Sequence, residues 1–266
     1  MNYDKEMDKI LDNCDRKPRI LLHSCCAPCS STCIDRLSDK ANLDIMYYNP
    51  NIEPEEEYLK RKEEQKKLIK LLNNDIKVLD CDYDNDKYHE VVKGYEKEPE
   101  KGSRCYICYK QRMEYTAKYA KDNGYDMFAT TLTVSPYKVT KWINEIGFDL
   151  EKKYNIKYLP TDFKKQNGYK KSIELSKKYN LYRQDYCGCI YSKKEKDSLF
   201  KWIFYNLILL FNSKWFSSPC FRWICSISPV CNLFALFAIK PASLDDAILV
   251  TPPVTSAECS PSFMIP

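Results

Sequence analysis

Cysteine is the residue type in this sequence with the richest chemistry, because 14 of the 266 residues are cysteine and only two are histidine. Thiolates bind soft metal ions and store electrons as disulfides, whereas a histidine-rich metal site would need more than two histidines. Six cysteines fall in three short groups, which are Cys25-Cys26, Cys105-x-x-Cys108 and Cys187-Gly-Cys189. These groups point to metal binding, electron transfer or both.

The first two groups have the spacing of metal ligands. Cys105 and Cys108 stand at the predicted start of a helix, where we expect depressed thiol pKa values. Four thiolates would also suit a structural zinc ion. The adjacent pair Cys25-Cys26 is awkward for two corners of one zinc tetrahedron but can reach different iron atoms of a cluster, which favours an iron–sulfur centre. Cys29 is ambiguous, because it lies near this site and also on the first turn of a predicted helix.

The third group, Cys187-Gly188-Cys189, favours a different chemistry. A disulfide between residues two apart closes a very small ring, and the intervening glycine lets the backbone bend. A strained bridge is easily reduced, which predicts a redox-active pair. Plain thiols or additional metal ligands are the alternatives. Asp185, two residues earlier, is a candidate proton donor or hard ligand, with a solvated loop carboxylate as the simpler interpretation.

Polar and basic residues indicate how a substrate is held. Ser135 and Lys138 follow a predicted strand and could hold a phosphate or sugar, although Ser-Pro is also a routine turn opener. Basic stretches at 60–70, 164–171 and 192–196 could follow RNA phosphates. In 60–70 the glutamates alternate with lysines at helical spacing, so a solvated helix face is the stronger interpretation.

The elements that must position these groups alternate along residues 1–199. Short apolar stretches predict five strands, at 19–24, 43–48, 75–80, 127–132 and 156–159. Helical patterns lie between and after them, at 29–38, 53–73, 84–94, 106–123, 136–152 and 168–179. This order predicts an α/β fold with a parallel sheet and flanking helices. Such a sheet binds ligands at the carboxyl ends of its strands, and the cysteine groups follow the ends of elements.

Composition divides the chain near Phe200. Residues 1–199 are rich in lysine and tyrosine and form the predicted catalytic domain. Residues 200–266 contain no glycine and few charged residues, which indicates an appended, low-charge segment. Translation outside the native coding sequence is one interpretation of this composition. The segment's apolar runs at 202–211 and 230–239 have about half of the ~20 residues that a membrane-spanning helix needs, so we expect no membrane partner.

The compartment is predicted from the start of the chain. Residues 1–10 are charged throughout and offer no apolar stretch for a secretory signal. A cytoplasmic, reduced chain is therefore expected, with cysteines serving as ligands or redox groups and not as structural disulfides. The net charge of +5 is small, so a polyanionic partner would have to be bound by a local patch.

Four motifs resemble, in order and spacing, the QueH-type epoxyqueuosine reductases, and together they cover about residues 17–192. They are HSCCAPCSS, CYICYKQRM, TTLTVSPYK and YCGCIYS. The resemblance implies an adenine-nucleotide α-hydrolase-like (HUP-like) fold and reduction of epoxyqueuosine to queuosine at the wobble position of tRNA, the last step of queuosine synthesis, without cobalamin. It also implies a [4Fe-4S] cluster on Cys25, Cys26, Cys105 and Cys108, and a redox-active pair at Cys187 and Cys189.

Several functional questions stay open at this level. An external electron donor is required, and an additional iron ion beside the cluster is possible. A tRNA-thiolating enzyme that uses ATP is one alternative, although no SGGxDS-like loop follows the first strand. A zinc-bound tRNA-binding module without catalysis is the other alternative.

Overall fold

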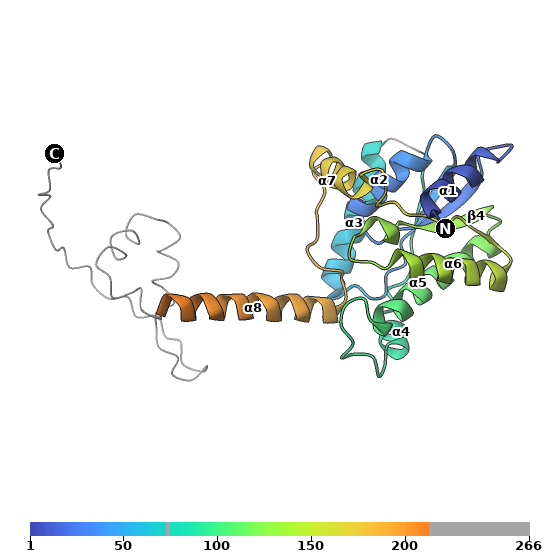
Figure 1. Cartoon of the computed structure of the whole chain (residues 1–266). Helices are drawn as coiled ribbons and strands as arrows, with labels where there is room; N and C mark the ends of the chain where they lie inside the picture. The colour runs from blue at the N-terminus through green and yellow to red at the C-terminus, as the bar shows by residue number, and fades with distance from the viewer. Residues whose placement is uncertain (73–74, 213–266) are drawn as a thin grey trace, which may run out of the picture. The chain divides into compact units, whose positions relative to one another are not determined.

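A five-stranded parallel sheet forms the centre of the molecule (Figure 1). The computed structural model describes residues 1–72 and 75–212. The strands lie in the order β3-β2-β1-β4-β5. Their bounds are β1 Arg19–His23, β2 Asn42–Met46, β3 Val78–Leu79, β4 Met127–Thr130 and β5 Lys157–Tyr158. The predicted α/β class, with a parallel sheet and flanking helices, is confirmed.

The central strand β1 is an uninterrupted apolar run because it is covered on both faces and paired on both edges. Ile20, Leu21 and Leu22 have no exposed surface. Leu22 lies opposite Ile45 of β2 and Ala129 of β4. Parallel register therefore carries three strands to one carboxyl edge, where their following loops meet.

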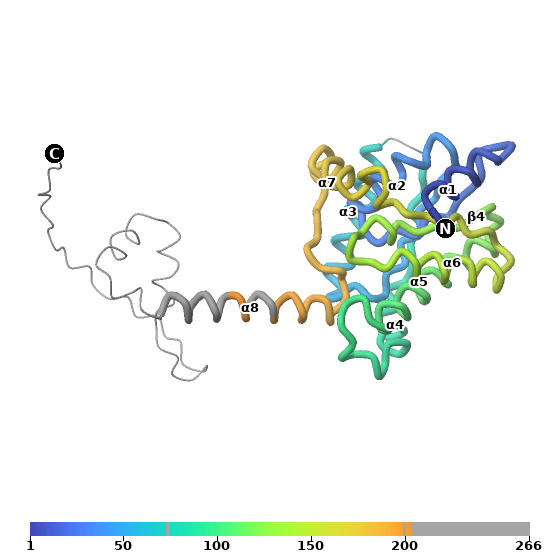
Figure 2. The backbone as a smooth tube through the Cα atoms, viewed as in Figure 1, coloured from blue at the N-terminus to red at the C-terminus, as the bar shows by residue number. Residues whose placement is uncertain are grey.

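Helices cover both faces of this sheet. Ile20 and Leu22 point to one face and pack with α1 (Tyr3–Asp12), α2 (Ala27–Leu37) and the region around α7. Leu21 points to the other face and packs with α5 (Ser103–Asp122) and α6 (Thr140–Tyr154). Helix α7 spans Gly168–Lys178, and it lies beside α2 although the two are far apart in sequence (Figure 2). The result is a three-layer α/β/α arrangement.

The remaining described helices are α3 (Glu55–Leu72), α4 (Asn85–Val91), the 3₁₀ turn η1 (Thr131–Val134) and α8 (Ile190–Asn212). Predicted element positions agree with the structure to within a few residues, but α1 and α8 were not predicted. The helix predicted as the last one is therefore followed by α8, which crosses position 200. A compact unit spans Met1–Lys201. Most of the predicted segment 200–266, including the apolar run 230–239, lies outside the described residues.

Strand order decides where a ligand binds. From β1 the chain moves to β2 and β3 on one side, and then returns to β4 and β5 on the other side. The loops after β1 and β4 therefore diverge at the carboxyl edge, which is the usual binding crevice of open parallel sheets.

None of the helices within the described residues is long and apolar enough to cross a membrane.

Candidate functional site

A pocket of about 510 Å³ opens at this carboxyl edge. Its lining includes Cys25 after β1, Ser135 and Lys138 after β4, and Asp185 and Cys187 before α8. Segments separated by more than a hundred residues thus contribute to one cavity. The pocket brings together a thiol of the first cysteine group, a thiol of the third and the predicted polar residues.

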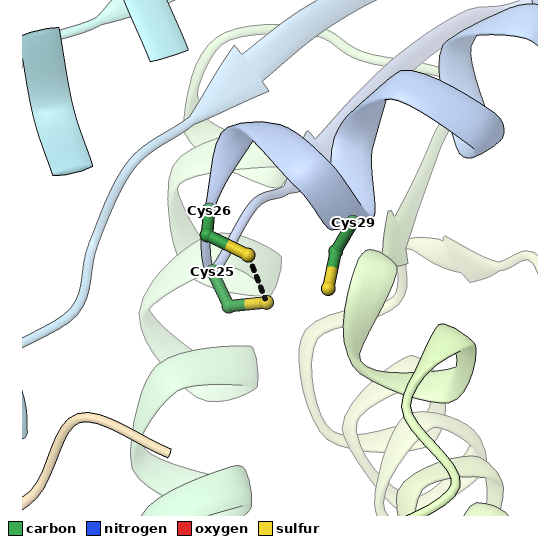
Figure 3. A group of neighbouring side chains, drawn as sticks. All are labelled: Cys25, Cys26 and Cys29. Atoms are coloured by element: carbon green, nitrogen blue, oxygen red, sulfur yellow. Dashed lines mark hydrogen bonds between the residues drawn. The ribbon is translucent and has the colours of Figure 1, made fainter. Parts of the chain in front are cut away.

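Three thiols gather at the start of α2 (Figure 3). The sulfur atoms of Cys25, Cys26 and Cys29 lie within 4.8 Å of one another, and the Cys25 and Cys26 sulfurs are 3.8 Å apart. Pro28 suits the first turn of the helix, so α2 begins at Ala27 and carries Cys29 toward its neighbours. Hydrogen bonds from the Cys26 and Cys29 thiols lower the pKa of Cys25 well below its ordinary value, with help from the Lys138 charge.

The same contacts raise the pKa values of the other two thiols, Cys26 and Cys29. Because Cys25 is the preferred thiolate, its hydrogen bond raises the pKa of Cys26 to about 12 and that of Cys29 well above the ordinary value. Of the three thiols, Cys25 is therefore the one that loses its proton most readily. A soft metal would release the remaining protons, since thiolates are the metal ligands.

Cys105 and Cys108 occupy the first turns of α5 and are buried, at 8% and 6% exposure. The prediction of depressed pKa values is wrong for both: burial raises the pKa of Cys105, and it raises that of Cys108 to about 11. Removal from water outweighs the helix dipole here. Within the described part of the chain, the three thiols at α2 are the only metal-ligand group with sulfurs this close, so α5 does not bring its pair to within 4.8 Å of them.

Cys187 and Cys189 differ in their surroundings. Cys187 lines the pocket, and the Lys138 ammonium donates to its sulfur at 3.2 Å. Cys189 is buried, and the Ser192 amide donates to its sulfur at 3.4 Å. Burial and the nearby Cys187 raise the pKa of Cys189 to about 12. Both residues are free thiols, with Cys187 facing the cavity and Cys189 behind it.

The backbone of this pair is held from two directions. The Arg61 guanidinium donates to the Cys187 carbonyl at 3.2 Å, and the Glu53 amide donates to the Gly188 carbonyl at 2.9 Å. The Cys187 amide donates to Ser192 Oγ at 3.2 Å. Helix α3, the turn before it and α8 therefore fix the position of the two thiols.

Comparison with known proteins identifies this arrangement. The family model described as "Epoxyqueuosine reductase QueH" matches residues 20–195. The chain belongs to the QueH family. The epoxyqueuosine reductase QueH of Staphylococcus epidermidis is 42% identical over 212 residues, covering 76% of this chain and 89% of that protein. The QueH of Streptococcus pyogenes is 41% identical over 201 residues, covering 73% of this chain and 79% of that protein.

Membership of the QueH family makes this chain an oxidoreductase, since its relatives are named as reductases. The match includes all three cysteine groups and every residue that lines the pocket except Lys196. It ends before the last turns of α8, so the family match does not extend into the atypical C-terminal composition. The family match therefore lies within the compact unit Met1–Lys201.

Ser135 and Asp185, the other predicted site residues of this QueH chain, differ in their hydrogen bonding and exposure. Ser135 Oγ accepts a hydrogen bond from the Tyr137 amide at 3.2 Å, as in a turn. The Asp185 side chain is 68% exposed and pairs with Lys196, which lowers its pKa. Asp185 thus lines the pocket as a solvated, ion-paired carboxylate. Substrate contacts by these residues remain predictions.

Arg112 is a site residue that the sequence analysis missed. It is 2% exposed, donates to Asn49 Oδ1, and places Nη1 4.0 Å from the Cys108 sulfur. No ion pair joins it to a carboxylate anywhere in the described residues. Although burial opposes its charge, the nearby thiolates of Cys108 and Cys25 raise the pKa of Arg112. Its position one helical turn after Cys108 was the available signal.

We predicted that the polar residues of 60–70 form a solvated helix face, and this prediction is wrong for two of them. Arg61 is 2% exposed and Gln65 is fully buried. Gln65 Oε1 accepts hydrogen bonds from Ser24 at 2.8 Å and Ser30 at 2.7 Å, next to the α2 cysteines. Arg61 and Gln65 are four residues apart on α3 and hence on one face. That face supports the site, whereas Lys62, the one lysine between them, pairs with Asp80.

Gly188 should tolerate no side chain. Its φ is +123°, and an added Cβ would lie 2.9 Å from Arg61 Nη1 and 3.0 Å from Ile52 Cγ1. Gly188→Ala is expected to lower the melting temperature by several degrees, for a strain of roughly 1–3 kcal/mol, and to reduce turnover at least ~10-fold. Differential scanning fluorimetry and a turnover assay provide the two measurements.

Gly124→Ala is the matched control for this change. Gly124 also has a positive φ, +66°, but an added Cβ meets nothing within 4 Å. Its replacement should lower stability without affecting turnover. Equal turnover in Gly188→Ala and Gly124→Ala would refute the steric requirement next to Cys187.

Proposed function

We propose that this chain reduces epoxyqueuosine to queuosine at the wobble position of tRNA, using an iron–sulfur centre and the Cys187/Cys189 pair. The observation that carries the proposal is the pocket at the carboxyl edge, where Cys25 and Cys187 share one cavity. The names of the relatives supply the reaction. The fold proposed for this unit is HUP-like, in keeping with the 3-2-1-4-5 strand order.

The thiol pair matches the stoichiometry of the reaction. Conversion of an epoxide to an alkene consumes two electrons and two protons and releases the oxygen as water. A dithiol that becomes a disulfide releases two electrons and two protons. One oxidation of Cys187 and Cys189 to a disulfide therefore balances one reduced epoxide. An external electron donor then reduces the disulfide for the next turnover.

The donor set fits an iron–sulfur group. The proposed ligands Cys25, Cys26, Cys105 and Cys108 are all sulfur donors, which suit such clusters and also zinc. Arg112 and Lys138 are buried cations with sulfur neighbours and no recorded carboxylate ion pair in the described residues. Buried cations need anions nearby, and a thiolate-ligated metal group carries net negative charge. Zinc has no redox chemistry, so reduction favours iron.

The proposal assigns a role to each residue around the two thiols. An iron–sulfur cluster bound here would relay the electrons of the thiol pair one at a time. Lys138 holds the Cys187 sulfur at the cavity wall by its hydrogen bond. Cys189 lies behind, ready to close the disulfide, and Arg61 holds the carbonyl of Cys187. Cys29 adds one thiol beyond the four proposed ligands and is the donor that an additional iron ion would use.

The proposed setting is the cytoplasm. All ten described cysteines are free thiols, which accords with a reducing compartment. The tRNA partner is inferred from the substrate in the relatives' names. No observation favours the ATP-dependent thiolating alternative, because cysteines stand where its phosphate loop would follow β1.

Anaerobic purification of the full chain tests the proposal. Iron and sulfide analysis should detect a cluster, with a broad absorption band near ~400 nm that bleaches on reduction. Incubation with tRNA that carries epoxyqueuosine and a chemical reductant should yield queuosine, identified by nucleoside mass spectrometry. A colourless protein with stoichiometric zinc and no product would overturn the proposal in favour of a tRNA-binding module.

Arg112 should tune the metal centre. In Arg112→Met, loss of a buried positive charge is expected to make the reduction potential more negative by tens of millivolts, since roughly 60 mV corresponds to about 1.4 kcal/mol for one electron. Arg112→Lys keeps the positive charge, so its reduction potential should be closer to that of the wild type. An anaerobic redox titration measures both. An unchanged potential in a methionine variant with full iron content would contradict this role.

A further inference from the structure

An exposed tyrosine stands at the rim of the pocket. Tyr137 lines the cavity, yet it is 60% exposed and belongs to none of the hydrophobic clusters in the described residues. Its amide donates to Ser135 Oγ, so the backbone that carries the ring is held in a turn. Packing of the fold does not account for the ring, which faces solvent one residue before Lys138.

Lysines gather around this ring. Lys101 Nζ lies 5.9 Å from the Tyr137 ring centroid. Lys164 Nζ donates to the Lys138 carbonyl at 3.3 Å, directly after Tyr137 in the chain. Burial lowers the pKa of Lys164, the positive charges of Lys101 and Lys165 lower it further, and Asp162 opposes them. Lys101 and Lys164, which belong to two different loops, therefore place two positive charges close to the exposed ring and its turn.

This combination is typical of contacts with unpaired RNA. Exposed aromatic rings stack on splayed bases, and neighbouring lysines bind the phosphates that link them. A like-charge cluster is unfavourable in the free protein and becomes favourable against a polyanion. The ring also lies at the rim of the cavity that contains Cys187, so a stacked base would be adjacent to a nucleotide inserted into the pocket.

We propose that Tyr137 stacks on a base next to the nucleotide that enters the pocket, while Lys101 and Lys164 contact the flanking phosphates. The inference rests on the proposed function, because it takes the substrate to be an RNA loop. It defines Tyr137 as a substrate-binding residue whose interaction is made equally before and during the chemical step. Its loss therefore affects binding and not the reaction rate at saturation.

The experiment uses the full chain with its metal centre and an anticodon stem-loop RNA that carries epoxyqueuosine. Tyr137→Ala should weaken binding and raise KM by roughly 5- to 100-fold with kcat unchanged, in line with the cost of losing one base stack. Tyr137→Phe keeps the ring and should restore wild-type values. Lys101→Met should weaken binding and reduce the dependence of the affinity on salt concentration.

Tyr95→Ala is the matched control, since Tyr95 is 41% exposed and does not line the pocket. It should bind the RNA like wild type. Equal KM and affinity in Tyr137→Ala and wild type, with wild-type turnover intact, would overturn the stacking inference alone. A wild-type protein that neither binds nor reduces the RNA would overturn the proposed function together with it.

Discussion

Cys187→Ser is expected to reduce epoxide turnover by at least ~100-fold while leaving the iron content unchanged. Cys187 lines the pocket, whereas the proposed metal ligands lie on α5 and around the start of α2. A serine hydroxyl keeps the size of the side chain but cannot form a disulfide with Cys189, so the two-electron store is lost. Turnover is measured by nucleoside mass spectrometry, and iron by a colorimetric assay on the same preparation.

Cys189→Ser should give the same phenotype, because both thiols are needed for one disulfide. The matched control is Cys14→Ser, which removes a thiol at the end of α1 that donates to the Ile10 carbonyl. It should retain wild-type turnover. Full turnover by Cys187→Ser with its iron intact would eliminate the dithiol role and leave the metal centre as the sole reductant.

Cys108→Ser is expected to lose most of the bound iron, together with all activity. Cys108 is 6% exposed on α5, and it is near Arg112, whose buried charge requires an anion. Removing a proposed ligand leaves an incomplete donor set for a cubane cluster. Iron and sulfide analysis after anaerobic purification gives the measurement, with the visible spectrum as a second one.

Cys29→Ser is the informative partner of this change. If the cluster uses Cys25, Cys26, Cys105 and Cys108, the Cys29 variant keeps its four irons and loses at most an additional iron ion. The opposite result, in which Cys29→Ser loses the cluster and Cys108→Ser retains it, would mean that the three thiols at α2 form the metal site. The two variants together therefore decide the ligand set.

Much of the fold was predictable because parallel strands that are covered on both faces have sequences of consecutive apolar residues. Ile20-Leu21-Leu22 is such a sequence, and β1 forms there. The short edge strand β3 was predicted too long, since only Val78 and Leu79 pair with β2. Helix α1 was not predicted because most of its residues are polar and its buried face contains only two large apolar side chains, Met7 and Leu11.

The sequence pointed to several residues that line the pocket, both thiols and polar groups, but not to the buried side chains that support them. Cysteine spacing is a local signal, and it led to the cavity that contains Cys25 and Cys187. Arg61 and Gln65 looked like members of a solvated lysine-rich helix, because only the tertiary packing of α3 decides which face is buried. The pKa of Cys108 could not be predicted either, because burial depends on residues distant in sequence.

The order of the segments along the chain bears on how the enzyme is made. The sheet is complete at Tyr158, and all four proposed metal ligands precede that residue. Cys187 and Cys189 follow it, and their backbone is held by Glu53 and Arg61, which are synthesised much earlier. On the ribosome, the proposed metal ligands are therefore translated before the proposed redox pair. A chain truncated between them would retain the proposed ligands without the two thiols that we propose as the reductant.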